Sequence, residues 1–266
     1  MMKALESSYG ICHLSIVPVR QTSSDKSEMT TQLLFGETFR ILEISENNKW
    51  IKIQSTYDQY EGWVDKKQYK SISEEYYQSY QSTEHLSTRQ GITVVQFANF
   101  SFPIVAGSVL PFLNELMEVD LGFATAEIVS TPEEPILNNK IDGEVLDFAY
   151  SFLAAPYLWG GRSHFGIDCS GLCQQIFRAL QITIPRDAWQ QALVGTFVNI
   201  EDSICGDLAF FKNEDNKIVH VGMVLDGGQI LHASGEVRID QLDNRGIYNS
   251  ERQQYSHYLS HLKRVL

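Results

Sequence analysis

One cysteine, Cys169, stands in a sequence setting that favours nucleophilic chemistry. It follows the segment 156–161, PYLWGG, and lies within the segment 166–172, GIDCSGL. Residues 172–180 then carry apolar side chains at helical spacing, which predicts a helix with Cys169 in its first turn. The positive end of a helix dipole stabilises a thiolate and lowers the pKa of the thiol. We therefore expect Cys169 to be a nucleophile at neutral pH.

A thiolate nucleophile needs a base, and His220 and His232 follow in strand-like segments. The chain order of cysteine, histidine and polar orienting group is one that papain-like enzymes use. If residues 226–228 form a three-residue loop, Leu225 pairs with Gln229, and the two histidines become diagonal neighbours on one face of the sheet. Their Cβ atoms would then be about 7–8 Å apart. A two-residue turn would instead put the two imidazoles on opposite faces.

Six blocks of the sequence, in chain order, resemble the NlpC family of cell-wall cysteine peptidases. The blocks are YLWGG at 157–161, DCSGL at 168–172, PRDAWQQ at 185–191, GDLAFF at 206–211, HVGM at 220–223 and HAS at 232–234. The resemblance covers the chain from about residue 141 to its end. It implies that Cys169 is the nucleophile and His220 the general base. It also implies that His232 orients the base and that Tyr157 helps to build the oxyanion site.

The composition is that of a globular enzyme, since 43% of the 266 residues are hydrophobic and 20% are charged. The net charge of −12 argues against a nucleic-acid-binding protein and against an anionic membrane surface as partner. No apolar run approaches the ~20 residues of a membrane-spanning helix, and residues 1–20 are too polar for a signal peptide. The four cysteines lack the spacing of a zinc site or a disulfide framework. We expect a monomeric cytoplasmic protein without a metal or an organic cofactor.

Residues 1–72 have the pattern of short β-strands. The segment 29–34 leads into a turn, a second turn signal lies at 46–49, and the pair Gly62-Trp63 closes the pattern. This arrangement resembles a bacterial SH3-like barrel, in which a Gly-Trp pair near the end is typical. We therefore assign 1–72 to a bacterial SH3-like domain.

Residues 73–130 are predicted to hold a connector helix and a second, divergent SH3-like domain. The segment 73–88 is rich in Glu, Tyr, Gln and Ser and is read as the helix, with its tyrosines as packing residues. The expected strands are 92–97, 102–105 and 122–129. Pro103 confines its strand to an edge of the sheet, because proline cannot donate a ladder hydrogen bond. The stretch 131–139, with two prolines and two asparagines, is read as a linker.

The third predicted domain, 131–266, begins with a helix over 141–153, and the nucleophile helix follows. The expected strands are 207–212, 217–225, 229–234 and 237–240. Helices first and an antiparallel sheet afterwards give an α+β domain, which the family resemblance makes papain-like and NlpC-type. The helix with Cys169 is expected to pack across the sheet that carries the two histidines.

Two SH3-like domains before an NlpC-type domain resemble the YkfC-like subgroup. That resemblance implies a dipeptidyl peptidase that cuts peptidoglycan stem peptides between γ-D-glutamate and the diamino acid, releasing L-Ala-γ-D-Glu from peptides with a free amino terminus. It implies that Glu28 and Tyr60 of the first domain hold the amine. Asp168, beside the nucleophile, is a further candidate, because a desolvated ammonium needs carboxylates. Ser170 and Trp159 are expected to shape the pocket.

Several residues have an alternative interpretation. Arg186 and Asp187 either bind substrate or form an intramolecular ion pair beside the site. Glu28 is otherwise a solvated loop charge, and Tyr60 an aromatic residue at a barrel edge. Surface or packing roles are assigned to His13, His85, His164, His257 and His261, and inert roles to Cys12, Cys173 and Cys205. A zinc site built on the cysteine and two histidines lacks the close ligand spacing of zinc motifs.

Other functions stay open at this point. A non-catalytic wall-peptide binder would be free to lose Cys169, His220 or His232, and all three are present. An amidase, an acyltransferase or an endopeptidase acting on intact peptidoglycan would use the same three residues.

Overall fold

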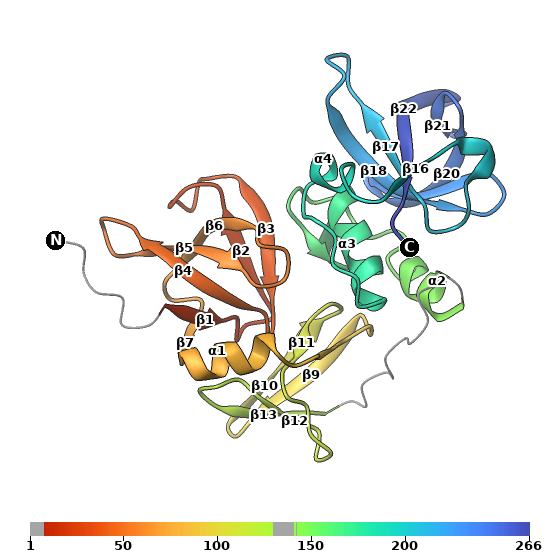
Figure 1. The fold of residues 1–266 in the computed structure, drawn as a ribbon. Coiled ribbons are helices and arrows are strands. Elements are labelled where there is room, and N and C mark those ends of the chain that lie inside the picture. The colour runs from red at the N-terminus through yellow and green to blue at the C-terminus, as the bar shows by residue number, and fades with distance from the viewer. Residues whose placement is uncertain (1–7, 130–140, 142) are drawn as a thin grey trace. The chain divides into compact units, whose positions relative to one another are not determined.

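The computed structural model describes residues 8–129, 141 and 143–266. Contacts divide the chain into two compact units, 1–135 and 136–266 (Figure 1). The predicted linker, 131–139, lies outside the described residues. The division into three domains, 1–72, 73–130 and 131–266, stays a prediction.

The first unit begins with a seven-stranded antiparallel sheet that forms the predicted N-terminal SH3-like domain. Its strands are β1 (Tyr9–Ile11), β2 (Ile16–Arg20), β3 (Met29–Leu34), β4 (Thr38–Ile44), β5 (Trp50–Ser55), β6 (Glu61–Asp65) and β7 (Lys70–Ile72). They are hydrogen-bonded in the order β3-β2-β6-β5-β4-β1-β7. Along β6 buried and less buried side chains alternate, because successive side chains point to opposite faces of a sheet. The buried faces enclose an apolar core that includes Val17, Leu33, Phe39, Ile51 and Val64.

A short helix, α1 (Glu74–Gln81), follows β7 and confirms a helix in the predicted connector, but it ends before residue 88, and residues 86 and 87 form a strand instead. Ser73 begins the helix, since its side-chain oxygen accepts a hydrogen bond from the Tyr76 N–H at 3.1 Å. This N–H has no carbonyl partner inside the helix, which is why serine is favoured at this position. Tyr77 and Tyr80 are buried and anchor the helix to the unit.

The rest of the first unit is a second, smaller set of strands. They are β8 (Leu86–Ser87), β9 (Ile92–Phe97), β10 (Phe100–Val105), β11 (Val109–Leu110), β12 (Glu118–Asp120) and β13 (Thr125–Ile128). Four of them form a sheet in the order β10-β9-β13-β12, while β8 pairs with β11. Pro103 lies in β10, at the edge of the sheet, as its missing N–H requires.

One hydrophobic core joins the two parts of the first unit. Ile11 and Phe35 contribute to it from the first part, Tyr77 from α1, and Val95 and Ile104 from the second part. The ring of Phe35, which is fully buried, contacts that of Phe102 edge to face at a centroid distance of 6.1 Å. The two predicted SH3-like domains therefore share this apolar packing, in addition to the core that the first sheet encloses by itself.

The second unit has helices first and a sheet afterwards, which confirms the predicted α+β class. Its helices are α2 (Gly143–Tyr150), α3 (Cys169–Ala179), α4 (Ala188–Gln191) and the 3-10 turn η1 (Ile200–Asp202). A hairpin of β14 (Arg162–Ser163) and β15 (Gly166–Ile167) precedes α3. The remaining strands are β16 (Thr196–Val198), β17 (Leu208–Lys212), β18 (Ile218–Leu225), β19 (Gln229–Ser234), β20 (Glu236–Asp243), β21 (Gly246–Asn249) and β22 (Gln254–Arg264).

The seven strands of this sheet follow the order β16-β22-β17-β18-β19-β20-β21, and an additional pairing of β21 with β22 closes the sheet on itself. The helix α3 packs against β18 and β19, as predicted. The long strand β22 was not predicted from the sequence. Among the described residues, no helix has the length and apolar character needed to cross a membrane.

The shared core of the first unit predicts the outcome of a substitution. Phe35→Ala should destabilise the first unit by about 3–5 kcal/mol, because it opens a cavity where both sets of strands meet. Hydrogen–deuterium exchange should then rise in β5 and in β9 together. Leu116→Ala is the control, since the Leu116 side chain is 75% exposed and should change stability by less than about 0.5 kcal/mol. Faster exchange in β5 alone would show that the two parts unfold independently.

Candidate functional site

The position of Cys169 is fixed by the way in which α3 begins. Asp168 has an extended backbone and is the N-cap, and its Oδ1 atom accepts a hydrogen bond from the Gly171 N–H at 2.7 Å. A Cβ atom on Gly171 would come within 2.4 Å of the Gly161 carbonyl oxygen, so only glycine fits this close approach. The prediction that Cys169 lies in the first turn of a helix is confirmed.

The Asp168 carboxylate is held by a buried ion pair. Arg186 donates to Oδ1 of Asp168 at 3.0 Å and to Oδ2 at 2.7 Å, and it also donates to the Ser170 hydroxyl oxygen at 2.8 Å. The Gly160 N–H donates to Oδ2 at 2.8 Å. Arg186 and Asp168 are both buried. For Arg186, the structure thus favours the intramolecular ion pair, whereas Asp187 is the N-cap residue of α4.

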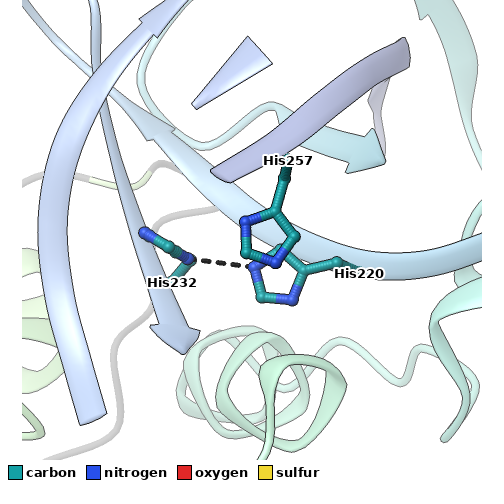
Figure 2. A group of neighbouring side chains, drawn as sticks. All are labelled: His220, His232 and His257. Atoms are coloured by element: carbon teal, nitrogen blue, oxygen red, sulfur yellow. Dashed lines mark hydrogen bonds between the residues drawn. The ribbon is translucent and has the colours of Figure 1, made fainter. Parts of the chain in front are cut away.

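The two predicted histidines meet on one face of the sheet. The strands β18 and β19 pair with Leu225 opposite Gln229 and Gly222 opposite His232, which confirms the predicted register. Nε2 of His220 lies 2.9 Å from Nδ1 of His232, within hydrogen-bond distance (Figure 2). Both side chains are buried.

The contact between the two histidines continues to a residue on a third strand that the sequence did not single out. Nε2 of His232 lies 3.1 Å from Oδ2 of Asp240, which is on β20. Arg238 donates two hydrogen bonds to the same carboxylate, from Nε to Oδ2 at 2.7 Å and from Nη2 to Oδ1 at 3.0 Å. The strand predicted over 237–240 ends at Asp240, a residue to which the sequence assigns no role. The position of Asp240 next to His232 follows from the pairing register of β19 with β20, which the sequence does not specify.

His257, on β22, is the other group that the sequence analysis did not place in the site. Its ring stacks on that of His220 with a centroid distance of 4.0 Å and an interplanar angle of 19° (Figure 2). Nitrogen atoms of His220, His232 and His257 lie within 4.8 Å of one another, a separation that a metal ion can bridge. The stacked rings of His220 and His257 are nearly parallel, however. A shared metal ion has to lie in the plane of each ligating ring, so this arrangement would have to rotate before it could bind one.

Burial keeps the candidate nucleophile and base uncharged. It raises the pKa of the Cys169 thiol to about 12, and the charge of Asp168 adds to this rise, while Arg186 and the Val221 backbone act in the opposite direction. The expected lowering of this pKa by the helix dipole is therefore wrong for the free protein, because burial outweighs it. Burial, with His257 and His232 nearby, lowers the pKa of His220 well below its ordinary value. The resting pair is a neutral thiol and a neutral imidazole.

Tyr157 lies in the same part of the second unit. It is half-buried, and its N–H donates to the Gly235 carbonyl oxygen at 2.9 Å. Burial, with Cys169 and Asp168 nearby, raises the pKa of the Tyr157 hydroxyl, so it keeps its proton and can donate a hydrogen bond. The Trp159 side chain is 59% exposed, which leaves it accessible to a ligand.

Glu28 and Tyr60 belong to the first unit. Glu28 is exposed and directly precedes β3, whereas Tyr60 is partly buried and directly precedes β6. Arg20 of β2 pairs with Met29 of β3 on one side and with Trp63 of β6 on the other. Glu28 and Tyr60, which precede β3 and β6, therefore lie at the same end of this sheet. Their participation in one site with Cys169 stays a prediction.

Comparison with known proteins agrees with this geometry. The sequence profile of the NlpC/P60 family matches residues 154–255, and that of the bacterial dipeptidyl-peptidase SH3 domain matches residues 19–68. The Gamma-D-glutamyl-L-lysine dipeptidyl-peptidase of Bacillus subtilis (strain 168) is 32% identical over 224 residues, which cover 76% of this chain and 71% of that protein. Dipeptidyl-peptidase 6 of Lysinibacillus sphaericus is 26% identical over 244 residues, covering 82% and 86%.

The fold also has a close counterpart among solved structures. The crystal structure of an NlpC/P60 family protein from Bacillus cereus ATCC 10987 matches 97% of this chain and 100% of its own, with a TM-score of 0.79 and 20% sequence identity. The family profile spans Cys169, His220 and His232, and the B. subtilis relative is matched over most of its length. On these grounds, the chain belongs to the NlpC/P60 family of peptidases and carries an N-terminal SH3 domain of the bacterial dipeptidyl-peptidase type.

Proposed function

We propose that this protein is a cysteine dipeptidyl peptidase that cleaves the bond between γ-D-glutamate and the diamino acid in peptidoglycan stem peptides. Its substrates carry a free N-terminal L-Ala, and the released product is L-Ala-γ-D-Glu. The observation that carries the proposal is the buried His220–His232 pair on the sheet against which the Cys169 helix packs. The name of the B. subtilis relative, which refers to a γ-D-glutamyl-L-lysine bond, supports the substrate class.

In the proposed reaction, the Cys169 sulfur attacks the γ-carbonyl carbon of D-glutamate. Nε2 of His220 is engaged with His232, so Nδ1 is the atom left to take the thiol proton. His220 then returns this proton to the departing amine of the diamino acid, and the C–N bond breaks. Water, activated by the same imidazole, hydrolyses the thioester and restores the thiol.

The negative charge that develops on the carbonyl oxygen needs hydrogen-bond donors. The Cys169 backbone N–H lies in the first turn of α3, where the helix provides no carbonyl partner. We assign the second donor to the Tyr157 hydroxyl, whose raised pKa keeps its proton in place.

Recognition of the free amine is assigned to Glu28, Tyr60 and Asp168. An ammonium removed from water is stabilised by carboxylates and by a hydroxyl group that can accept its hydrogen bonds. Asp168 already accepts hydrogen bonds from Arg186 and from backbone N–H groups, so it would share its charge with the substrate. Ser170 and the exposed ring of Trp159 would line the pocket.

The proposed setting is the cytoplasm, where the enzyme would act as a monomer on peptides recovered from the cell wall. The described part of the chain contains four cysteines, and all four are free thiols. Free thiols are the usual state in a reducing compartment, which supports this location.

The nucleophile can be tested by alkylation and by substitution. Cys169→Ala should abolish turnover, whereas Cys205→Ala, the control in the same unit, should leave it unchanged. Iodoacetamide should label Cys169 faster than the other three cysteines, because a histidine base can take its proton. Exposure alone would favour Cys205, which is only partly buried. Mass spectrometry of the labelled peptides measures the order, and preferential labelling of Cys205 would contradict the assignment.

The lowered pKa of His220 predicts the acid side of the pH profile. A protonated His220 cannot accept the thiol proton, so kcat/KM should fall only when the pH drops below the ordinary imidazole value of 6.5. His257 is one of the groups that lower this pKa, so His257→Gln should move the midpoint upward toward 6.5. A midpoint at or above 6.5 in the unmodified protein would argue against a buried neutral base.

The amine contact separates a dipeptidyl peptidase from an endopeptidase acting on intact wall. Acetylating the amine of L-Ala-γ-D-Glu-L-Lys removes its positive charge and one charge-assisted hydrogen bond, and it adds bulk at the proposed contact, at a cost of about 2–4 kcal/mol. The blocked peptide should therefore show a roughly 30- to 1000-fold lower kcat/KM.

Substitutions locate this contact. Glu28→Gln should reduce the difference in kcat/KM between the free and the acetylated peptide more than Tyr60→Phe does, because the substrate's ammonium requires the negative charge of Glu28. Glu46→Gln, an exposed carboxylate in the same domain, is the control. Equal cleavage of the two peptides by the unmodified protein would replace our proposal with an endopeptidase.

A further inference from the structure

Three polar side chains form a diagonal row across neighbouring strands of the second unit. Gly222 of β18 pairs with His232 of β19, so His220 is diagonal to His232 on the same face. On the other side of β19, His232 pairs with Arg238 of β20, and Asp240 is two residues farther on. The row His220–His232–Asp240 is joined by contacts of 2.9 Å and 3.1 Å.

The end of the row is a carboxylate that is held in its charged form. Asp240 is 5% exposed. Burial alone would raise the pKa of Asp240, but hydrogen bonds from His232 and Arg238 lower it below its ordinary value. Arg238 binds the carboxylate through two atoms, with contacts of 2.7 Å and 3.0 Å, a geometry that fixes its orientation. An ionised carboxylate accepts hydrogen bonds and cannot donate them.

This charge determines where the protons lie along the row. Because Asp240 only accepts, the contact at Nε2 of His232 requires a proton on that nitrogen. Where His232 is neutral, its Nδ1 carries no proton and can only accept a hydrogen bond, so Nε2 of His220 must carry a proton. Nδ1 of a neutral His220 is left without one, and this is the atom that can take the proton of Cys169.

We propose that Asp240 is a positioning residue of the reaction: through His232, it selects the tautomer of His220 whose Nδ1 can accept the Cys169 proton. The inference rests on the proposed roles of Cys169 and His220 and extends them by one strand. When His220 becomes charged during the reaction, its Nε2–H donates along the row toward a fixed negative charge. A carboxylate that orients a catalytic histidine has the same role in serine-protease triads, where it contacts the base directly. Here an imidazole lies between them.

The groups packed around the row are consistent with this role. His257 of β22 stacks on His220, and burial with nearby His232 lowers the pKa of His257 to about 4, so it adds no charge near neutral pH. Cys169 faces the row from α3, as the thiol interacts with the Val221 backbone next to His220. Arg238 is the cation that the structure places on Asp240, with Glu251 as its outer partner.

Asp240→Asn is the informative substitution. The new amide can be oriented in two ways. In both, its NH2 group faces an N–H of Arg238 and cannot accept from it. In one of them, the NH2 group also faces Nε2 of His232 and donates to it. That orientation reverses both tautomers and puts a proton on Nδ1 of His220. We expect kcat/KM to fall by on the order of 10²-fold, the upper part of the range for groups that orient a ligand or base, with KM within about threefold.

An alkylation assay, which needs no substrate, tests the effect of Asp240 on the protons of the row. The rate of Cys169 alkylation by iodoacetamide is measured against pH for the unmodified protein and for Asp240→Asn, Asp240→Glu and Glu251→Gln. In Asp240→Asn the profile should shift to higher pH, because the thiol must ionise without an effective base. Asp240→Glu, which keeps the charge, should recover part of the shift. Glu251→Gln is the control, since its side chain is 75% exposed and contacts Arg238 at 3.4 Å as its outer partner.

Nitrogen-15 NMR of the histidine rings tests the tautomers directly. In the unmodified protein, His220 and His232 should both carry their proton on Nε2 at neutral pH, and in Asp240→Asn this pattern should be lost. An unchanged alkylation profile with unchanged tautomers in Asp240→Asn would overturn the inference. A lower melting temperature with an unchanged profile would overturn it as well, since it would make Asp240 a purely structural residue.

The same experiment keeps this inference distinct from the proposed function. If Cys169 of the unmodified protein reacts no faster than the other cysteines, the nucleophile assignment fails. If Cys169 is reactive and Asp240→Asn matches the unmodified protein, only the role of Asp240 fails.

Discussion

The Asp168 carboxylate connects the elements that hold Cys169 in place. A buried carboxylate is costly unless its oxygen atoms are bonded, and Asp168 receives hydrogen bonds from Arg186 and from the backbone N–H groups of Gly160 and Gly171. These donors come from the glycine-containing turn, from the start of α3 and from the segment before α4. One buried ion pair thus ties three parts of the chain to the residue that precedes the candidate nucleophile, and the close approach of Gly161 to Gly171 follows from the same arrangement.

Burial also determines the charge state of the site. The positive end of α3 favours a thiolate, but removing Cys169 from water opposes ionisation more strongly, and burial opposes a charged His220 as well. In the free protein the pair is therefore neutral, and in the proposed reaction its proton moves when substrate is bound. For such a pair, the direction of the imidazole hydrogen bonds matters more than a pre-formed charge, which is why the row from His220 to Asp240 is central to our interpretation.

Much of the architecture could be predicted from local sequence patterns. The bounds expected for β9 and β19 agree with the structure, as does the loop that sets Leu225 opposite Gln229, whereas only the first part of the connector predicted over 73–88 is helical. The strands β21 and β22 were missed. In β22 the alternating, less exposed positions include His257 and His261, whose polar rings lack the apolar signal that marks a strand. These rings contact Phe211 and Phe210 only because β22 pairs with β17, and its further pairing with β21 closes the sheet.

By itself the sequence determined the family resemblance and singled out Cys169, His220 and His232 as candidate site residues, because these depend on residue types and short spacings. The tertiary structure decided which groups those residues meet. Asp240 and His257 come from strands whose register no local pattern specifies, and Arg186 reaches Asp168 across a loop. The tertiary structure also reversed the direction of the expected pKa shift of Cys169. The depth of burial depends on how the whole unit packs, whereas a helix dipole can be inferred from neighbouring residues alone.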